Sequence, residues 1–229
     1  DQLLERIEAD ARKHAGGRAW RIVMLGDYVD RGPDSAGVLD RVMALDAAGH
    51  VVLPGNHEQL MHDALNARTG DVDSPAQGWW LNGGKQTLKS YGATQLSRRR
   101  APRAFEIVPA RHRTFLRKIL EERPVYHRDE TDGLFFVHAG VKPGRTLKDT
   151  SREVLLWGRA PAFMAAHGER WVDGLRVVHG HTPVDAPDVH EHRVGLDTGA
   201  VYGGALTCGV FDDGTLARVL SVRAGASDP

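Results

Sequence analysis

Side chains that could bind a divalent cation follow four apolar runs in this 229-residue chain. RIVML is followed by GD, VVLP by GNHE, LFFV by HAG, and LRVV by HGH. Carboxylate, amide and imidazole groups are oxygen and nitrogen donors for such ions. Glycines beside them allow sharp turns and close backbone approach. The pattern therefore predicts a metal site built from the ends of four strands.

Each of these features alone also has a structural explanation. A GD pair after a strand is often a turn, and GN before a helix is often a cap. A histidine at a strand end is often a hydrogen-bonded core residue. Four such features in succession favour the metal site over four separate structural roles.

The surrounding pattern predicts an α/β protein that brings these strand ends together. Hydrophobic periodicity predicts helices over residues 2–14 and 36–47 and buried strands over 21–25 and 50–53. In an open α/β sheet, ligands bind outside the carboxyl ends of the strands. The middle of the chain, residues 58–124, is expected to be mainly helix and loop, with a helix over 111–122.

The chain after residue 124 is expected to be rich in strands. Residues 125–139 predict a hairpin, 175–180 and 192–197 two strands, and 206–213 with 215–222 a meander that turns at DG. The composition shows no break or long linker, so a single domain over residues 1–229 is expected.

Charge and composition exclude several classes of partner. Lys+Arg and Asp+Glu are 30 each, which argues against a nucleic-acid footprint or an anionic-membrane surface. Arg98–Arg100 is interpreted as a solvated loop. No apolar stretch is long enough to span a bilayer. The single cysteine, Cys208, excludes an internal disulfide and is interpreted as a buried structural thiol in a cytoplasmic protein. The sequence does not indicate an oligomeric state.

The motifs together resemble a known family. GDYVDRG, GNHE, HAG and GHTP, in this order, resemble the signature blocks of the calcineurin-like metallophosphoesterases. The phosphoprotein phosphatase branch is the most similar, in particular the bacterial serine/threonine protein phosphatases. LLWGRAPAF and LDTGAVYGGALTCGV resemble the C-terminal half of that family. The resemblance implies a four-layer α/β/β/α sandwich of two mixed sheets flanked by helices.

The resemblance implies a centre with two divalent metal ions. Asp27 corresponds to the carboxylate that bridges the ions. Asn56, His138 and His181 correspond to the other ligands of the second ion. Manganese is the expected metal, with iron or zinc as alternatives.

The resemblance also implies the catalytic residues. His57 corresponds to the general acid that protonates the leaving oxygen, and Asp30 to the residue that orients its ring. Arg31 and Arg159 correspond to a clamp on the phosphoryl oxygens. Water activated by the metals is expected to attack phosphorus directly, without a covalent enzyme intermediate.

The expected activity is that of a metal-dependent phosphomonoester hydrolase, with a serine/threonine protein phosphatase as the first choice. Its substrate would be a phosphorylated protein or a small phosphoester. A symmetrical dinucleoside-tetraphosphate hydrolase is an alternative, although the second aspartate of GDxxDRG, Asp30, argues against it. A non-catalytic phosphate-binding relative is the alternative from a different class.

Other polar residues near the motifs have structural interpretations. His179 is expected to face the sheet interior or to support a ligand. The D-x-H of Asp188 and His190 is interpreted as surface or structural. Asp197 could support the site or form a turn.

Aromatic residues in the middle of the chain leave two interpretations open. Trp79, Trp80 and Asn82 could line a substrate groove. Core packing is the more common role of such tryptophans.

One block of the family pattern is not found in the sequence. The GD-x-HG motif, which supplies an aspartate and a histidine to the first metal, is absent, and Pro183 occupies the place of another histidine in GHxH. Only Asp27 remains for the first ion. We expect a truncated chain rather than a natural loss, with one sheet strand missing, weak binding of the first metal and severely reduced turnover.

Overall fold

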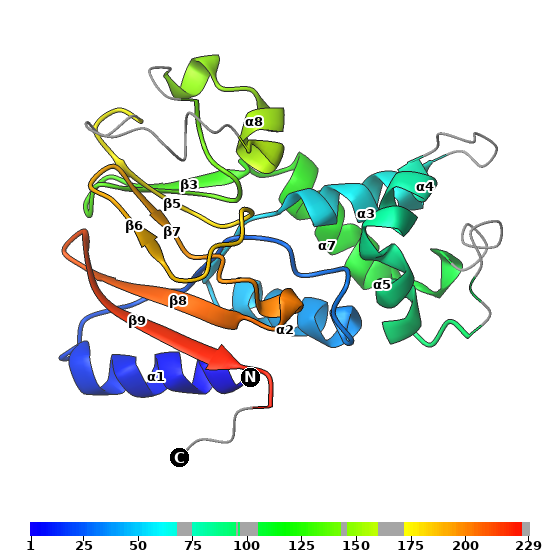
Figure 1. Ribbon diagram of the computed structural model, residues 1–229, viewed down its shortest axis with the longest axis horizontal. Coiled ribbons are helices and arrows are strands. Elements are labelled where there is room, and N and C mark those ends of the chain that lie inside the picture. Colours follow the sequence, from blue (N-terminus) through cyan, green and yellow to red (C-terminus); the bar gives the residue numbers. More distant parts are fainter. Residues whose placement is uncertain (68–74, 95, 97–104, 143–145, 160–171, 226–229) are drawn as a thin grey trace. The chain divides into compact units, whose positions relative to one another are not determined.

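A computed structural model describes residues 1–67, 75–94, 96, 105–142, 146–159 and 172–225. The chain divides into two compact units (Figure 1). Unit 1 comprises Asp1–Ile22 and Tyr126–Pro229, and unit 2 comprises Val23–Val125. The expected single domain over residues 1–229 stays a prediction.

Unit 2 is mainly helical and contains two short strands. Its elements are β1 (Val23–Met24), α2 (Ser35–Ala47), β2 (Val51–Val52), α3 (Asn56–Asn66), α4 (Pro75–Trp79), the π-helix η1 (Trp80–Gly84), α5 (Lys85–Ser90), η2 (Phe105–Ile107) and α7 (Ala110–Glu121). β1 and β2 pair in parallel, with Val23 opposite Val51. The strands expected over 21–25 and 50–53 are therefore present but shorter.

Capping and apolar periodicity explain the helices of unit 2. The Asp34 carboxylate accepts a hydrogen bond from the Gly37 N–H at 2.9 Å, which caps α2 as expected from the sequence. Leu116 and Ile119 of α7 recur at helical spacing and are fully buried. They belong to one core cluster with Leu39 of α2 and Met61 of α3. This core supports the loops that follow β1 and β2.

Unit 1 contains a five-stranded mixed sheet and a long hairpin. Its elements are α1 (Gln2–His14), β3 (Tyr126–Asp129), β4 (Leu134–Val137), η3 (Leu147–Asp149), α8 (Arg152–Trp157), β5 (Arg176–His179), β6 (Asp188–Val189), β7 (Arg193–Gly195), η4 (Ala200–Tyr202), β8 (Ala205–Asp212) and β9 (Thr215–Arg223). The sheet order is β3-β4-β5-β7-β6. β8 and β9 form a separate antiparallel pair, and α1 runs alongside it (Figure 1).

The central strands of the mixed sheet position two histidines. β4, β5 and β7 run in parallel, with Phe136 opposite Val178 and Val178 opposite Val194. These residues are at most 8% exposed, as expected for parallel strands covered on both faces. His138 directly follows β4, and His181 follows β5 by two residues. Both therefore lie at the carboxyl edge of the same sheet.

The α/β fold class and the order of its elements agree with the sequence-based expectation. The helices over 2–14, 36–47 and 111–122 are present, within one residue at each end. The hairpin at 125–139 and the meander with its DG turn are also confirmed. Among the described residues, the strands form one mixed sheet and two two-stranded sheets.

Two further expectations concern individual residues. Cys208, expected to be buried, is half-buried, and desolvation by its surroundings raises the pKa of its thiol to about 11. Arg98–Arg100 lies outside the described residues. Within the part of the chain that the structure describes, no helix has the length and apolar character needed to cross a membrane.

Candidate active site

The loop after β1 has an unusual backbone. Asp27, Asp30 and Arg31 have φ angles of 60°, 76° and 62°, in the left-handed region. Non-glycine residues pay about 1–2 kcal/mol each for this conformation. Such strain persists only where surrounding contacts hold it, and it is common at functional sites.

Close packing of two loops brings the chemistry-bearing residues of unit 2 together. Gly26 has a φ of 96°, and a Cβ at this position would lie 2.4 Å from the Gly55 nitrogen. Any side chain at residue 26 would therefore separate the loop after β1 from the loop after β2. The contact brings Asp27 to the first turn of α3, where the His57 N–H donates to Asp27 Oδ1 at 3.2 Å.

Glu58 holds the same two loops by hydrogen bonds. Its carboxylate is fully buried and accepts four backbone N–H bonds. The donors are Gly55 at 2.7 Å, Asp27 at 2.8 Å, Tyr28 at 2.7 Å and Val29 at 3.2 Å. Burial, with the charge of Asp27, raises the pKa of Glu58 to about 7, whereas the four N–H groups favour its ionised form. One carboxylate thus fixes the backbone of Asp27.

His57 and Asp30 form a buried hydrogen-bonded pair. His57 Nδ1 lies 2.7 Å from Asp30 Oδ2, and the two residues are 4% and 6% exposed. Burial lowers the pKa of His57, but the bond to Asp30 and the charges of Asp27 and Asp30 outweigh it, so its pKa is raised. Burial raises the pKa of Asp30 against the effect of its hydrogen bonds. This arrangement suits a histidine that holds a proton and delivers it from Nε2.

The remaining predicted residues of unit 2 lie next to this pair. Asn56 is the first residue of α3 and is 4% exposed. The Arg31 N–H is 3.4 Å from the Gly83 carbonyl oxygen. Asp27, Asp30, Arg31, Asn56 and His57 therefore occupy one loop and the adjoining helix end.

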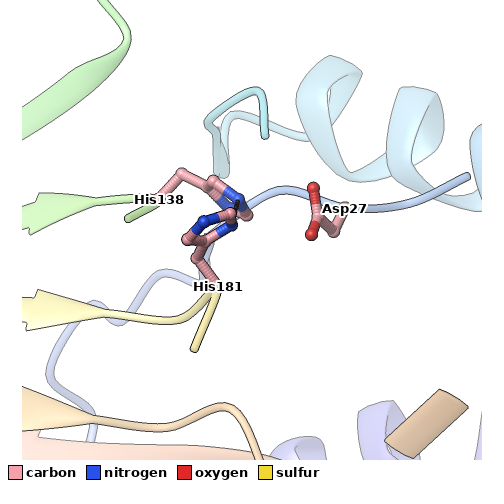
Figure 2. A group of neighbouring side chains, drawn as sticks. All are labelled: Asp27, His138 and His181. Atoms are coloured by element: carbon pink, nitrogen blue, oxygen red, sulfur yellow. Dashed lines mark hydrogen bonds between the residues drawn. The ribbon is translucent and has the colours of Figure 1, made fainter. Parts of the chain in front are cut away.

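Unit 1 contributes a pair of buried histidines. Figure 2 shows the rings of His138 and His181 next to each other, and their planes are inclined by 65°. His138 Nε2 and His181 Nδ1 are 3.1 Å apart, and the residues are 1% and 7% exposed. His181 has a φ of 64°, which turns the chain sharply after β5. The Arg159 Nε donates to His181 Nε2 at 3.2 Å.

The histidine pair fits a metal ligand set. Two nitrogen ligands about 2.1 Å from one ion and at right angles to each other are about 3.0 Å apart. The 3.1 Å between the two imidazole nitrogens matches this spacing. Neutral imidazoles and a carboxylate are also the donor types that manganese, iron and zinc accept.

His179, Asp188, His190 and Asp197, which the sequence did not place among the metal ligands or catalytic residues, make contacts that support the fold. His179 lies within β5, is 1% exposed, and burial lowers its pKa to about 4. Asp188 pairs with the buried Arg193 at 2.6 Å and with His190 at 2.7 Å. Asp197 Oδ1 accepts a hydrogen bond from the Gly199 N–H at 3.0 Å, which is a turn contact.

The groove candidates divide into buried and surface residues. Trp79 is 1% exposed and packs against Phe105, with ring centroids 5.5 Å apart. Trp80 is half-buried, and Lys85 Nζ lies 6.0 Å from its ring centroid. Asn82 Nδ2 donates to the Gly78 carbonyl oxygen at 2.8 Å. Trp79 is therefore a core residue, which agrees with the core-packing interpretation of the sequence.

Comparison with known families shows to which of them the chain belongs. The model of the calcineurin-like phosphoesterase family matches residues 3–205. The chain belongs to the calcineurin-like phosphoesterases. The resemblance seen in GDYVDRG, GNHE, HAG and GHTP is thereby confirmed, and the family is one of metal-dependent phosphoester hydrolases.

Several similar proteins are named as dinucleoside tetraphosphatases. The chain is 28% identical over 211 residues to the asymmetrical bis(5'-nucleosyl)-tetraphosphatase PrpE of Anoxybacillus flavithermus, covering 87% of this chain and 78% of the relative. It is 30% identical over 219 residues to the protein of that name from Geobacillus thermodenitrificans, covering 91% and 81%. A crystal structure of a protein provisionally designated a diadenosine tetraphosphatase has a TM-score of 0.61 at 22% identity, covering 95% of this chain and 86% of that one. This likeness shows the fold.

Two sets of contacts in the site were not predicted from the sequence. Glu58 was visible in GNHE, and its place three residues after Gly55 is that of a capping-box acid. Its hydrogen bonds to the loop after β1 cannot be predicted from the neighbouring sequence. The contacts of Trp79 and Thr87 with Asp30 span 49 and 57 residues and have no sequence signal at all.

Proposed function

We propose that this calcineurin-like phosphoesterase cleaves a phosphoester or phosphoanhydride bond by direct attack of water on phosphorus. The observation that supports it is the His57–Asp30 pair, at 2.7 Å and buried beside the loop that carries Asp27 and Arg31. His57 is the general acid that delivers the Nε2 proton to the leaving oxygen. Asp30 accepts from Nδ1 and stabilises the protonated ring.

Asp27, Asn56, His138 and His181 are the proposed metal ligands. A bound divalent ion would supply a Lewis acid that activates water and neutralises charge on the phosphoryl group. The sequence contains donors matching the family motif for one complete ion site, with Asp27 alone matching the other. We expect manganese to bind best, ahead of iron and zinc.

Arg31 and Arg159 are the proposed clamp on the phosphoryl oxygens. The planar guanidinium group matches two oxygens of one phosphoryl group, which a lysine cannot do. Each arginine lies beside a residue of the site in its own unit: Arg31 is next to Asp30 in the sequence, and Arg159 donates a hydrogen bond to His181.

The proposed substrate is a dinucleoside tetraphosphate that is cleaved asymmetrically. Support comes from relatives of that name, which are 27–30% identical over 74–81% of their length. A serine/threonine phosphoprotein is the second candidate, because GDYVDRG and GNHE resemble the protein phosphatase branch. Symmetrical cleavage of the tetraphosphate is the third.

Product analysis separates these candidates. The purified protein is incubated with manganese and diadenosine tetraphosphate, and the products are resolved by anion-exchange chromatography. Asymmetrical cleavage yields AMP and ATP, whereas symmetrical cleavage yields only ADP. Release of phosphate from a phosphothreonine peptide at a higher kcat/KM would support the second candidate instead.

A His57→Asn variant controls for contaminating activity. Loss of the general acid is expected to lower turnover about 100-fold or more. Metal binding without hydrolysis of any of these substrates by the wild-type protein would overturn the proposed hydrolase, and would favour a non-catalytic phosphate-binding relative.

A further inference from the structure

Asp30 has a second carboxylate oxygen that His57 does not use. Its Oδ1 accepts a hydrogen bond from Trp79 Nε1 at 2.8 Å and from Thr87 Oγ1 at 2.7 Å. All four side chains lie within unit 2 and are at most 6% exposed. The carboxylate is therefore held at both oxygens in a site without bulk water.

Thr87 also holds the backbone of Asp30. The Asp30 N–H lies 2.9 Å from Thr87 Oγ1 and 3.2 Å from Ser35 Oγ, and the two hydroxyls are 3.1 Å apart. Asp30 has a φ of 76°, a conformation that needs such support. The hydroxyl of Thr87 thus braces both the main chain and the side chain of Asp30.

The sequence WWLNGG around Trp79 allows this approach. Gly83 has a φ of 117°, and a Cβ there would lie 2.7 Å from the Arg31 nitrogen and 2.9 Å from Asp30 Cβ. A Cβ on Gly84 would lie 2.6 Å from the Trp79 ring. The two glycines therefore allow η1 and the Trp79 ring to pack closely against the loop that carries Asp30.

Rotation about the last torsion of an aspartate is soft, so one hydrogen bond does not fix its carboxylate. With Oδ1 held by two donors, Oδ2 has a single orientation toward His57 Nδ1. We propose that Trp79 and Thr87 are positioning residues, which hold Asp30 so that it keeps the proton of His57 on Nδ1 and directs Nε2 to the leaving group. This inference rests on the proposed function of His57.

A purely structural role for the tryptophan is the competing explanation. A buried indole N–H needs some acceptor, and Asp30 could serve only that need. The two roles predict different effects on the rate of hydrolysis. A positioning role acts on protonation of the leaving group, so it matters most where the leaving group is a poor one.

The test compares Trp79→Phe and Thr87→Val with wild type on two substrates. We expect kcat to fall about 10-fold or more on an alkyl phosphate, whose leaving oxygen needs a proton. On 4-nitrophenyl phosphate, whose leaving group departs without one, the loss should be at most about 3-fold. KM should change little in either case. Thr87→Ser keeps the hydroxyl and is expected to restore activity on the alkyl phosphate.

Tyr91→Phe is the matched control. Tyr91 follows the helix that carries Thr87, and the variant loses one part-buried hydrogen bond, between the Tyr91 hydroxyl and His112 Nδ1 at 2.6 Å. Its hydrogen bond and its ring contact are both with His112, and neither involves Asp30 or His57. An equal loss on both substrates, matched by Tyr91→Phe, would overturn the inference.

A second readout does not depend on turnover. The His57 Nδ1 proton is expected to give a downfield NMR signal, because it lies in a short bond to a carboxylate. We expect Trp79→Phe and Thr87→Val to shift or broaden it, and Tyr91→Phe to leave it unchanged. If the wild-type protein hydrolysed neither these two phosphates nor diadenosine tetraphosphate, the proposed function would fail. An unchanged signal in both variants would then overturn the positioning role separately.

Discussion

The side chain of Glu58 stabilises the backbone of the two loops that carry the proposed site. The carboxylate of Glu58 binds the amides of Gly55, Asp27, Tyr28 and Val29, which belong to two loops. Buried N–H groups without a partner cost about 1–3 kcal/mol each. The left-handed backbone of Asp27 therefore depends on a residue that is neither a proposed ligand nor a proposed acid.

Glu58→Gln tests this dependence. Glutamine has an NH₂ group in place of one carboxylate oxygen. This group cannot accept a hydrogen bond, so the backbone N–H groups that bind that oxygen lose their acceptor. We expect the free energy of unfolding at pH 8 to fall by about 2–3 kcal/mol, measured by urea titration. The affinity for manganese, measured by calorimetry, should fall as well, because Asp27 loses its support.

Glu121→Gln is the matched control for Glu58. Its side chain is 55% exposed and pairs with His62 at 2.9 Å, so its loss should change stability by about 0.5 kcal/mol or less. Equal stability of the two glutamine variants would show that the amide contacts of Glu58 contribute little.

At the scale of secondary structure, carboxylates on α2 connect this helix to α7 and the residues after it. Asp40 binds Arg111 at 3.0 Å and the fully buried His112 at 2.8 Å. Asp46 binds Lys118 at 2.9 Å and also Arg123. These pairs join α2 to α7 and to the residues after it at two places along α2.

The pH dependence of stability follows from Asp40. Hydrogen bonds from Arg111 and His112 lower its pKa to about 2, from an unfolded value of about 3.9. A carboxyl with a lowered pKa stabilises the fold above its unfolded pKa, and this contribution is lost as the pH falls through the folded value. The contribution is therefore present at pH 7, declines below about pH 4 and is gone near pH 2.

Asp40→Asn should show this dependence directly. Because the Asp40 side chain is half exposed, we expect a loss of only about 0.5–1 kcal/mol at pH 7. The difference from wild type, from urea midpoints at several pH values, should disappear toward pH 2. Asp213→Asn, at an exposed turn, is the control and should match wild type throughout. A difference for Asp40→Asn that persisted at pH 2 would contradict the assignment to this ion pair.

At the scale of the whole molecule, the proposed chemistry is distributed over two units. The acid pair His57–Asp30 and the carboxylate of Asp27 belong to unit 2, while His138 and His181 belong to unit 1. The chain starts in unit 1, forms unit 2 over Val23–Val125 and then returns. If one ion takes ligands from both segments, metal binding stabilises both at once.

Thermal unfolding in manganese tests this distribution. At a free metal concentration 100 times Kd, binding to the folded state adds about 2.7 kcal/mol. We expect this stabilisation to be lost in His181→Ala and in Asp27→Asn alike, and to persist in Asp30→Asn. Asp27→Asn with undiminished stabilisation would show that the histidine pair binds the ion without unit 2.

Several features of the fold and site follow from local sequence. The helices over 2–14 and 36–47, the Asp34 cap and the DG turn depend on neighbouring residues, so their patterns predict them. β1 and β2 are shorter than their apolar runs, because strand length depends on the pairing partner. Within unit 1, His138 and His181 follow the rule that the carboxyl ends of neighbouring parallel strands meet at one edge of the sheet.

The sequence by itself determined the family, the order of elements and the candidate residues for metal binding and acid–base chemistry, because these depend on residue types at short spacing. Only the tertiary structure decided what supports them. The bond of Trp79 to Asp30, the hydrogen bonds of Glu58 to the loop after β1 and the 3.1 Å spacing of His138 and His181 join residues that lie 29 or more positions apart. Such contacts depend on side-chain direction and packing, which no local pattern encodes.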